Sequence, residues 1–171
     1  MHGIIKSVLS GDTVIVMGLD ASRGPPPEKL ISLGGISAPR LGNKSTPDAA
    51  HAWQSREFLR QQTIGKRVSF QLEAQAPSAP SNRSFGSVFL EDGTSLASLQ
   101  VSNGWAKPRP NGPPELIDAA SAAESQGLGV WGVGGVGAIR DIQYSGTFDA
   151  SELLKSYKGT PQEAILEQVR L

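Results

Sequence analysis

Apolar and polar residues alternate along several short segments of the chain, which is the spacing of half-buried β-strands. Two such segments, 3–9 and 13–17, are separated by Gly11 and Asp12, residue types that tolerate the dihedral angles of a tight turn. This pattern predicts a β-hairpin. A third strand is expected over 30–36, after a proline-rich loop.

A helical segment follows the third strand and precedes two more strands. Pro47 and Asp48 are residue types that begin helices, and they open a segment that ends in glycine, so we expect a helix over 47–65. Apolar and polar residues alternate in 67–73, and 85–93 ends in an Asp-Gly turn. Both of these segments are predicted strands.

Two further helices are expected, one over 95–104 and one over 113–127. The second has apolar residues at i, i+3, i+4 and i+7, which is the spacing of one helix face. These residues are Leu116, Ala119, Ala120 and Ala123. Three strands, a helix, two strands and then helices is the order of an oligonucleotide-binding (OB) fold. We therefore predict an α+β protein built on a five-stranded β-barrel with about three helices, a fold whose face commonly receives nucleic acid.

Seven aromatic residues offer rings for base stacking in such a fold. They are Trp53, Phe58, Phe70, Phe85, Phe89, Trp105 and Trp131. We expect most of them to lie in the core, because a barrel of this size needs several large side chains. Base stacking is the alternative for each ring.

The composition narrows the class of protein. At 171 residues the chain is long enough for one well-buried domain and an appendage. It contains no cysteine and two histidines, His2 and His51, so disulfides and thiolate metal sites are excluded and a zinc site is not expected. No apolar run approaches the ~20 residues that span a bilayer, and we expect a soluble, cytoplasmic protein.

The net charge is zero, but the charge is unevenly distributed about Gly112. Residues 1–112 hold 12 Lys and Arg against 8 Asp and Glu, and residues 113–171 hold 4 against 8, so the two parts carry +4 and −4. The first part therefore favours a polyanionic partner.

We expect the domain to occupy residues 1–131, with a linker at 132–160 and a segment at 161–171 that begins a following repeat. The linker begins with GVGGVG, which matches a dinucleotide-binding glycine pattern but lacks the preceding strand that this fingerprint needs. The end of the chain, AILEQVRL, spaces its apolar residues much as the first strand does.

Six segments of the chain, in order, carry a resemblance to a known family. They are SGDTVIV, EKLISLGGISAPRL, WQSREFLRQQTIGKRVSF, RSFGSVFLEDG, NGWAK and GLGVW. Together they resemble the first staphylococcal-nuclease-like repeat of the Tudor staphylococcal nuclease (Tudor-SN) family. The resemblance covers residues 3–131, and 138–171 resemble the connector and first strand of a second repeat.

The resemblance implies a cleft that, in the parent nuclease fold, holds calcium with two aspartates, positions water with a glutamate and stabilises the transition state with two arginines. In this chain Asp12 matches the first aspartate. The other positions carry Ser32 for the first arginine, Ser37 for the second aspartate, Arg40 for the glutamate, and Ser84 or Ser87 for the second arginine, with Arg83 close by. Because most of the constellation is absent, we expect Asp12 to be a catalytic relic in a structural turn and a weak candidate ligand for Ca²⁺. No cofactor is expected to be required, and Ca²⁺ only if the domain is an active nuclease.

Basic residues of the first part are candidate phosphate contacts, each set against the alternative of a solvated surface charge. Arg40 and Arg83 come first, because they border the cleft that the resemblance implies. The full set is Arg40, Lys44, Arg56, Arg60, Lys66, Arg67, Arg83, Lys107 and Arg109.

From the resemblance we predict an RNA-binding, catalytically degenerate nuclease-like domain of a multi-repeat scaffold protein in RNA silencing and RNA processing. Its expected partners are single- or double-stranded RNA and the proteins of ribonucleoprotein and silencing complexes, including cytoplasmic stress granules. One alternative is a Ca²⁺-dependent endoribonuclease. The other is a protein–protein interaction module, whose binding would not fall with salt as RNA binding does.

Overall fold

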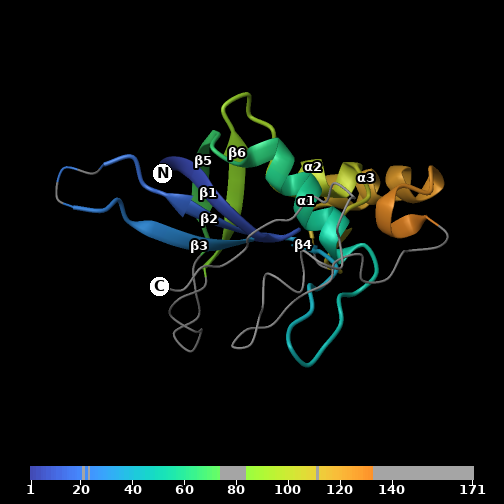
Figure 1. Cartoon of the computed structure of the whole chain (residues 1–171). Coiled ribbons are helices and arrows are strands. Elements are labelled where there is room, and N and C mark those ends of the chain that lie inside the picture. The colour runs from blue at the N-terminus through green and yellow to red at the C-terminus, as the bar shows by residue number, and fades with distance from the viewer. Residues whose placement is uncertain (21, 23, 74–83, 111, 133–171) are drawn as a thin grey trace, which may run out of the picture. The chain divides into compact units, whose positions relative to one another are not determined.

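Five strands form a closed barrel in the computed structural model, which describes residues 1–20, 22, 24–73, 84–110 and 112–132 (Figure 1). In barrel order these strands are β1 (His2–Ser10), β2 (Thr13–Met17), β3 (Glu28–Leu33), β6 (Ser84–Leu90) and β5 (Arg67–Leu72). The predicted five-stranded barrel is therefore confirmed, and β1 and β2 form the predicted hairpin.

The pairing of β3 with β6 closes the barrel. These two strands run parallel, whereas β2 with β3 and β5 with β6 are antiparallel. Ser32 of β3 lies opposite Thr13 of β2 on one side and opposite Phe85 of β6 on the other. Directly opposed residues share one face of a sheet, so these three side chains form a row across three strands.

Three helices gather beside one end of the barrel (Figure 1). They are α1 (Ala52–Thr63), α2 (Leu96–Ser102) and α3 (Pro114–Ser125). α1 packs on β1, while α2 packs on both β6 and α3. Leu116, Ala120 and Ala123 of α3 are buried, which confirms the apolar face that their spacing predicts.

A second, smaller sheet lies outside the barrel. It joins β4 (Ile36–Ser37) to β7 (Lys107–Pro108), and a 3₁₀ turn, Gly129–Trp131, follows α3. The predicted third strand, 30–36, is therefore two strands. The chain turns at Gly34 and Gly35, and Gly35 has a φ of 74°, which glycine adopts without strain.

The first helix begins later than the sequence predicts. α1 starts at Ala52 and not at Pro47, so the predicted N-terminus is wrong. Asp48 does not cap the helix, because its Oδ1 accepts a hydrogen bond from the backbone N–H of Gly42 at 2.6 Å and so holds the preceding loop. His51 takes the left-handed conformation immediately before the helix, with a φ of 63°.

The barrel core is aliphatic. Its fully buried side chains include Ile5, Val14, Ile31, Leu33 and Val88. Of the seven aromatic residues, Phe70 is buried, Phe85 is exposed and the other five are half-buried. The expectation that most aromatic rings lie in the core is therefore wrong. The interior of a small closed barrel is narrow, and inward-facing branched aliphatic side chains fill it.

Several predictions from the sequence concern residues outside those that the structure describes. The linker at 132–160, apart from Gly132, and the start of a following repeat at 161–171 stay predictions, as does any role of Arg83. Within the described part of the chain, no helix is long and apolar enough to cross a bilayer.

Candidate nucleic-acid cleft

Asp12 occupies the turn between β1 and β2, where its carboxylate is a hydrogen-bond acceptor. Oδ1 accepts from Ser10 Oγ at 2.6 Å and from Thr13 Oγ1 at 3.1 Å. Oδ2 accepts from the backbone N–H of Ala38 at 3.2 Å, and the Asp12 carbonyl oxygen accepts from the backbone N–H of Leu33 at 2.8 Å. Asp12 therefore ties the hairpin turn to the end of β3 and to the segment after β4.

Close packing behind this turn explains why residue 11 is glycine. A Cβ on Gly11 would overlap the hydroxyl oxygen of Ser55 in α1. Gln100 of α2 is fully buried, and its Nε2 donates to the carbonyl oxygens of Gly11 at 2.5 Å and Ser55 at 3.1 Å. Ser55 Oγ in turn donates to the carbonyl oxygen of Trp105 at 2.7 Å. The two helices thus hold the turn in one conformation.

The donor set around Asp12 does not fit a calcium ion. Calcium takes roughly six to eight oxygen ligands, several of them carboxylates in tight sites. Across the residues that the structure describes, no three His, Cys, Asp or Glu side chains lie close enough together to hold a metal ion. Both carboxylate oxygens of Asp12 already accept hydrogen bonds from the protein. The geometry favours the structural role of Asp12, and no catalytic step through calcium follows from it.

The serines that the resemblance aligns with catalytic positions differ in exposure. Ser32 is 2% exposed, and its hydroxyl oxygen lies 3.4 Å from the hydroxyl oxygen of Thr13 on β2. Ser37 and Arg40 are exposed at and after β4. Ser87 is exposed on β6 and lines a pocket, whereas Ser84 of the same strand is buried. A serine hydroxyl cannot supply the positive charge that an arginine brings to a phosphoryl transition state.

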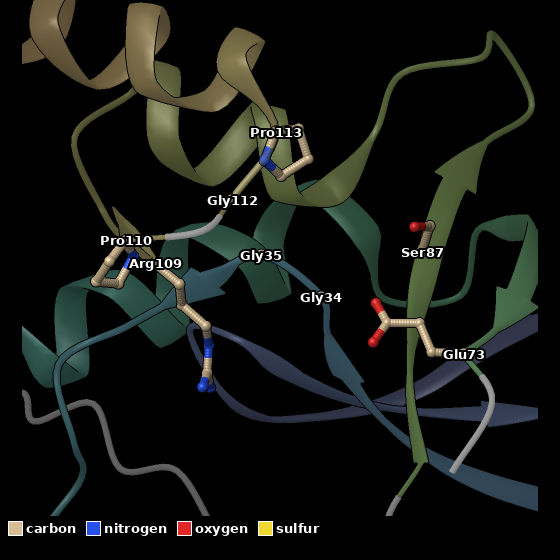
Figure 2. Close-up of a pocket in the computed structure, with 8 residues that line it drawn as sticks. All are labelled: Gly34, Gly35, Glu73, Ser87, Arg109, Pro110, Gly112 and Pro113. Atoms are coloured by element: carbon tan, nitrogen blue, oxygen red, sulfur yellow. The ribbon is translucent and has the colours of Figure 1, made fainter. Parts of the chain in front are cut away.

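A pocket of about 480 Å³ lies beside the Gly34-Gly35 turn (Figure 2). Its volume is in the range of small-molecule sites. Figure 2 shows Glu73 and Ser87 on one side of this turn and Arg109 on the other. A Cβ on Gly34 would overlap Oε1 of Glu73, so the carboxylate lies directly over the backbone of that glycine. The pocket thus has one acidic and one basic wall.

The β4–β7 sheet brings Arg109 to this pocket. Its backbone N–H donates to the carbonyl oxygen of Gly35 at 2.8 Å, and its Nε donates to the carbonyl oxygen of Ile36 at 2.9 Å. Its Cζ lies 5.8 Å from the centroid of the Phe85 ring, within cation–π range. No described residue accepts a hydrogen bond from its two Nη nitrogens. The guanidinium is therefore fixed in place and can still bind an anionic ligand.

The two predicted cations of α1 are engaged within the protein. Arg56 Nε donates to the carbonyl oxygen of Val8 at 2.9 Å, and its Cζ lies 4.9 Å from the centroid of the Trp53 ring. Arg60 Nη2 lies 2.6 Å from Oε1 of Glu57. The hydrogen bond from Arg60 lowers the pKa of the Glu57 carboxyl, although burial opposes this, and the same contact raises the pKa of Arg60. Glu57 therefore neutralises much of the charge that Arg60 would offer to a phosphate.

The other predicted cations are spread over the surface. Lys66 and Arg67 are exposed where β5 begins, at the opposite end of that strand from the pocket. Lys44 is exposed in the loop before α1. Lys107 is exposed on β7 and its Nζ lies 4.3 Å from the centroid of the Trp131 ring. Of the described candidates, Arg109 is the one that lines the pocket.

Sequence reasoning missed two residues of this region. Gln100 lies four positions after the buried Leu96, and that spacing is a signal for the inner face of α2. Glu73 carries no such signal, because its neighbour Gly34 is remote in the sequence.

The sequence of this chain is similar to one known protein family and to several longer proteins. The family described as Staphylococcal nuclease homologue matches residues 30–133. Ribonuclease TUDOR 2 of Arabidopsis thaliana is 40% identical over 189 residues, which cover 99% of this chain and 19% of that protein. Ribonuclease TUDOR 1 of the same plant is 39% identical, with the same coverage. Staphylococcal nuclease domain-containing protein 1 of Drosophila melanogaster is 36% identical over 99% of this chain and 20% of its own length. The chain thus spans about a fifth of the length of these relatives.

Proposed function

The chain belongs to the staphylococcal nuclease homologue family, among relatives of the Tudor-SN type, and from this premise we propose that its barrel binds RNA without cutting it. In this proposal the barrel is one catalytically degenerate repeat of a longer scaffold protein. That protein acts in RNA silencing and RNA processing, in the ribonucleoprotein complexes of the cytoplasm.

The hydrogen bonding of Asp12 is the main observation in support of the proposal that the barrel does not cleave RNA. Hydrolysis by the parent chemistry needs a bound calcium ion and two arginines at the phosphate. Here the matching carboxylate accepts hydrogen bonds from Ser10, Thr13 and Ala38. Ser32, which the resemblance aligns with the first arginine, is 2% exposed. Losing several members of a catalytic constellation leaves little turnover, although such losses do not simply add.

Arg109 supports the binding of RNA. It is exposed and held by Ile36, and no described residue accepts from its Nη nitrogens, so it can pair with a phosphate in bidentate fashion. Arg40 is also exposed, two residues after the backbone N–H that Asp12 binds. Phosphate contacts of this kind attract RNA of any sequence and weaken as salt rises.

A second candidate function is that of a Ca²⁺-dependent endoribonuclease. The names of the two Arabidopsis relatives, Ribonuclease TUDOR 1 and 2, favour it. Since the chain covers about a fifth of those proteins, their activity can reside in parts that this chain does not match.

The salt dependence of RNA binding tests the proposed function. Fluorescence anisotropy with short labelled single- and double-stranded RNA, repeated over a range of KCl concentrations, gives the slope of log K against log salt. We expect a negative slope. Arg109→Ala should weaken binding about 10-fold and make the slope shallower by about 1, Arg109→Lys should lose less, and Arg67→Ala at the far end of β5 should lose at most about 2-fold. Binding that does not change with salt, or an Arg109→Ala variant that binds as the parent chain does, would refute it.

A further inference from the structure

We propose that the pocket between Glu73 and Arg109 receives a guanine base of the bound RNA, and that Glu73 is the residue that selects it. This inference rests on the proposed function, since it names the base that one part of the RNA-binding surface reads.

The acidic wall argues against a pocket that holds phosphate. The Glu73 carboxylate lies over the backbone of Gly34, where a phosphate would meet a negative charge at close range. The negative charge of the Glu73 carboxylate suits a ligand group that presents N–H donors, because a carboxylate accepts hydrogen bonds. Glu73 holds this position because its backbone N–H donates to the carbonyl oxygen of Phe85 at 2.8 Å, at the end of β5. Its side chain makes no hydrogen bond within the described part of the chain and is free to accept from a ligand.

Guanine is the base whose edge best fits a carboxylate. Its Watson–Crick edge carries two neighbouring donors, N1–H and the 2-amino group, which match the two oxygens of a carboxylate. Adenine and cytosine each present one amino donor beside a ring acceptor, and uracil presents one donor between two carbonyl acceptors. These acceptors would face Glu73 and be repelled by it. The side chain therefore discriminates by attraction and by repulsion.

The opposite wall matches the phosphate to which the base is attached. Arg109, whose Nε is held by the carbonyl oxygen of Ile36, lines the pocket on the other side of the glycine turn from Glu73 (Figure 2). A guanine nucleotide has a donor edge at one end and an anionic group at the other, so it complements both walls. A lone cation, such as a lysine side chain of a protein partner, would suit Glu73 but be repelled by Arg109.

Two glycines line the pocket between Glu73 and Arg109. Gly34 and Gly35 place a peptide group without side chains between the two walls. A Cβ on Gly34 would overlap the Glu73 carboxylate, and a Cβ on Gly35 would come within 3.0 Å of the Pro113 ring. Any larger residue at either position would press against a side chain that lines the pocket, so the two glycines allow Glu73 and Pro113 to lie close to the backbone of the turn.

Base-swapped oligonucleotides test this inference. We would measure the affinity of the 171-residue chain for uridine-rich RNAs that differ only in one central base: guanine, inosine, adenine or cytosine. We expect guanine to bind about 10-fold more tightly than adenine or cytosine, and inosine, which lacks the 2-amino donor, to fall between them. Glu73→Gln should reduce the preference for guanine to about 2-fold or less and leave the affinity for the adenine RNA equal or higher. Glu91→Gln is the matched control, since it removes an exposed carboxylate that does not line the pocket and should keep the full preference.

Titration with guanosine and adenosine monophosphates separates this inference from the proposed function. RNA binding without a preference for guanine, or a preference that survives Glu73→Gln, would overturn the inference and leave RNA binding in place. Guanosine monophosphate binding that depends on Glu73, without affinity for longer RNA, would support the pocket and overturn the proposed function. Failure of every RNA and both mononucleotides to bind would overturn both.

Discussion

Replacement of Asp12 by alanine should destabilise the barrel, because the carboxylate binds three parts of the fold together. It accepts hydrogen bonds from Ser10, Thr13 and the backbone N–H of Ala38. A hydrogen bond to a charged acceptor contributes about 1.5–3 kcal/mol, and a donor left unpaired costs about 1–3 kcal/mol. The half-buried Ser10 hydroxyl can turn to water and the buried Thr13 hydroxyl can turn to Ser32 Oγ, 3.4 Å away, while the Ala38 N–H is fixed in the backbone. We therefore expect Asp12→Ala to lower the free energy of unfolding by about 2–3 kcal/mol, well below the sum of three separate bonds.

Thermal unfolding followed by circular dichroism measures this loss. For a domain of this size, about 2–3 kcal/mol corresponds to a fall in Tm of roughly 6–15 °C. Asp12→Asn keeps the shape and one acceptor oxygen and should lose about half as much. The matched control is Asp20→Ala, because Asp20 is exposed and accepts from the adjacent Ser22 backbone, and we expect it to change stability by about 0.5 kcal/mol or less.

Calcium distinguishes a structural carboxylate from a metal ligand in the same assay. An ion that binds only the native state raises Tm, and above Kd the rise grows with the logarithm of the ion concentration. We expect millimolar calcium to leave the Tm of the parent chain unchanged. A structural role of Asp12 would be contradicted if Asp12→Ala unfolded at the parent temperature, or if calcium stabilised the parent chain and the variant lost that stabilisation.

Two further predictions concern stability. Gly11→Ala places a Cβ against Ser55 Oγ and disturbs the bond from Gln100, so chemical denaturation should show a loss of about 1–3 kcal/mol, and equal stability would contradict the packing described. The pKa of Glu57 is lowered by Arg60 in the folded state, so this pair stabilises the fold above the ordinary glutamate pKa of about 4.3, and that contribution is lost as the pH falls through the lowered value. Because Arg60 is 36% exposed, the contribution is about 0.5 kcal/mol or less: between neutral pH and about pH 3 the parent chain should lose that much more stability than Glu57→Gln, and equal losses would contradict the pairing.

The sequence predicts the barrel well because its strands carry strong local signals. The Gly11-Asp12 turn and the alternation of 67–73 depend on near neighbours, and both are found in the structure. The start of α1 is missed because Asp48 binds Gly42, a partner that local propensity does not reveal. The aromatic residues are misplaced because the core volume depends on how the barrel closes, which is set by the parallel pairing of β3 with β6.

In the candidate site, too, local sequence places some residues, whereas distant contacts place others. Asp12 belongs to a Gly-Asp-Thr turn of consecutive residues, so the sequence is sufficient to place it between β1 and β2. The match of Ser32, Ser37 and Arg40 to catalytic positions rests on the resemblance and stays a prediction. Arg109 is a candidate by its charge, but the sequence does not distinguish it from the other basic residues. Its position depends on the β4–β7 sheet, and Glu73 depends on Gly34. The pocket is lined by residues from four separate segments, so no local sequence pattern predicts it.

The proposed function requires that this barrel holds RNA and does not cut it. Incubation of end-labelled RNA with a saturating amount of the chain, with calcium or with a chelator, tests binding and cleavage on parallel native and denaturing gels. We expect RNA that is shifted on the native gel and full-length on the denaturing gel, with calcium and without it. Calcium-dependent products that disappear with Asp12→Ala would contradict it.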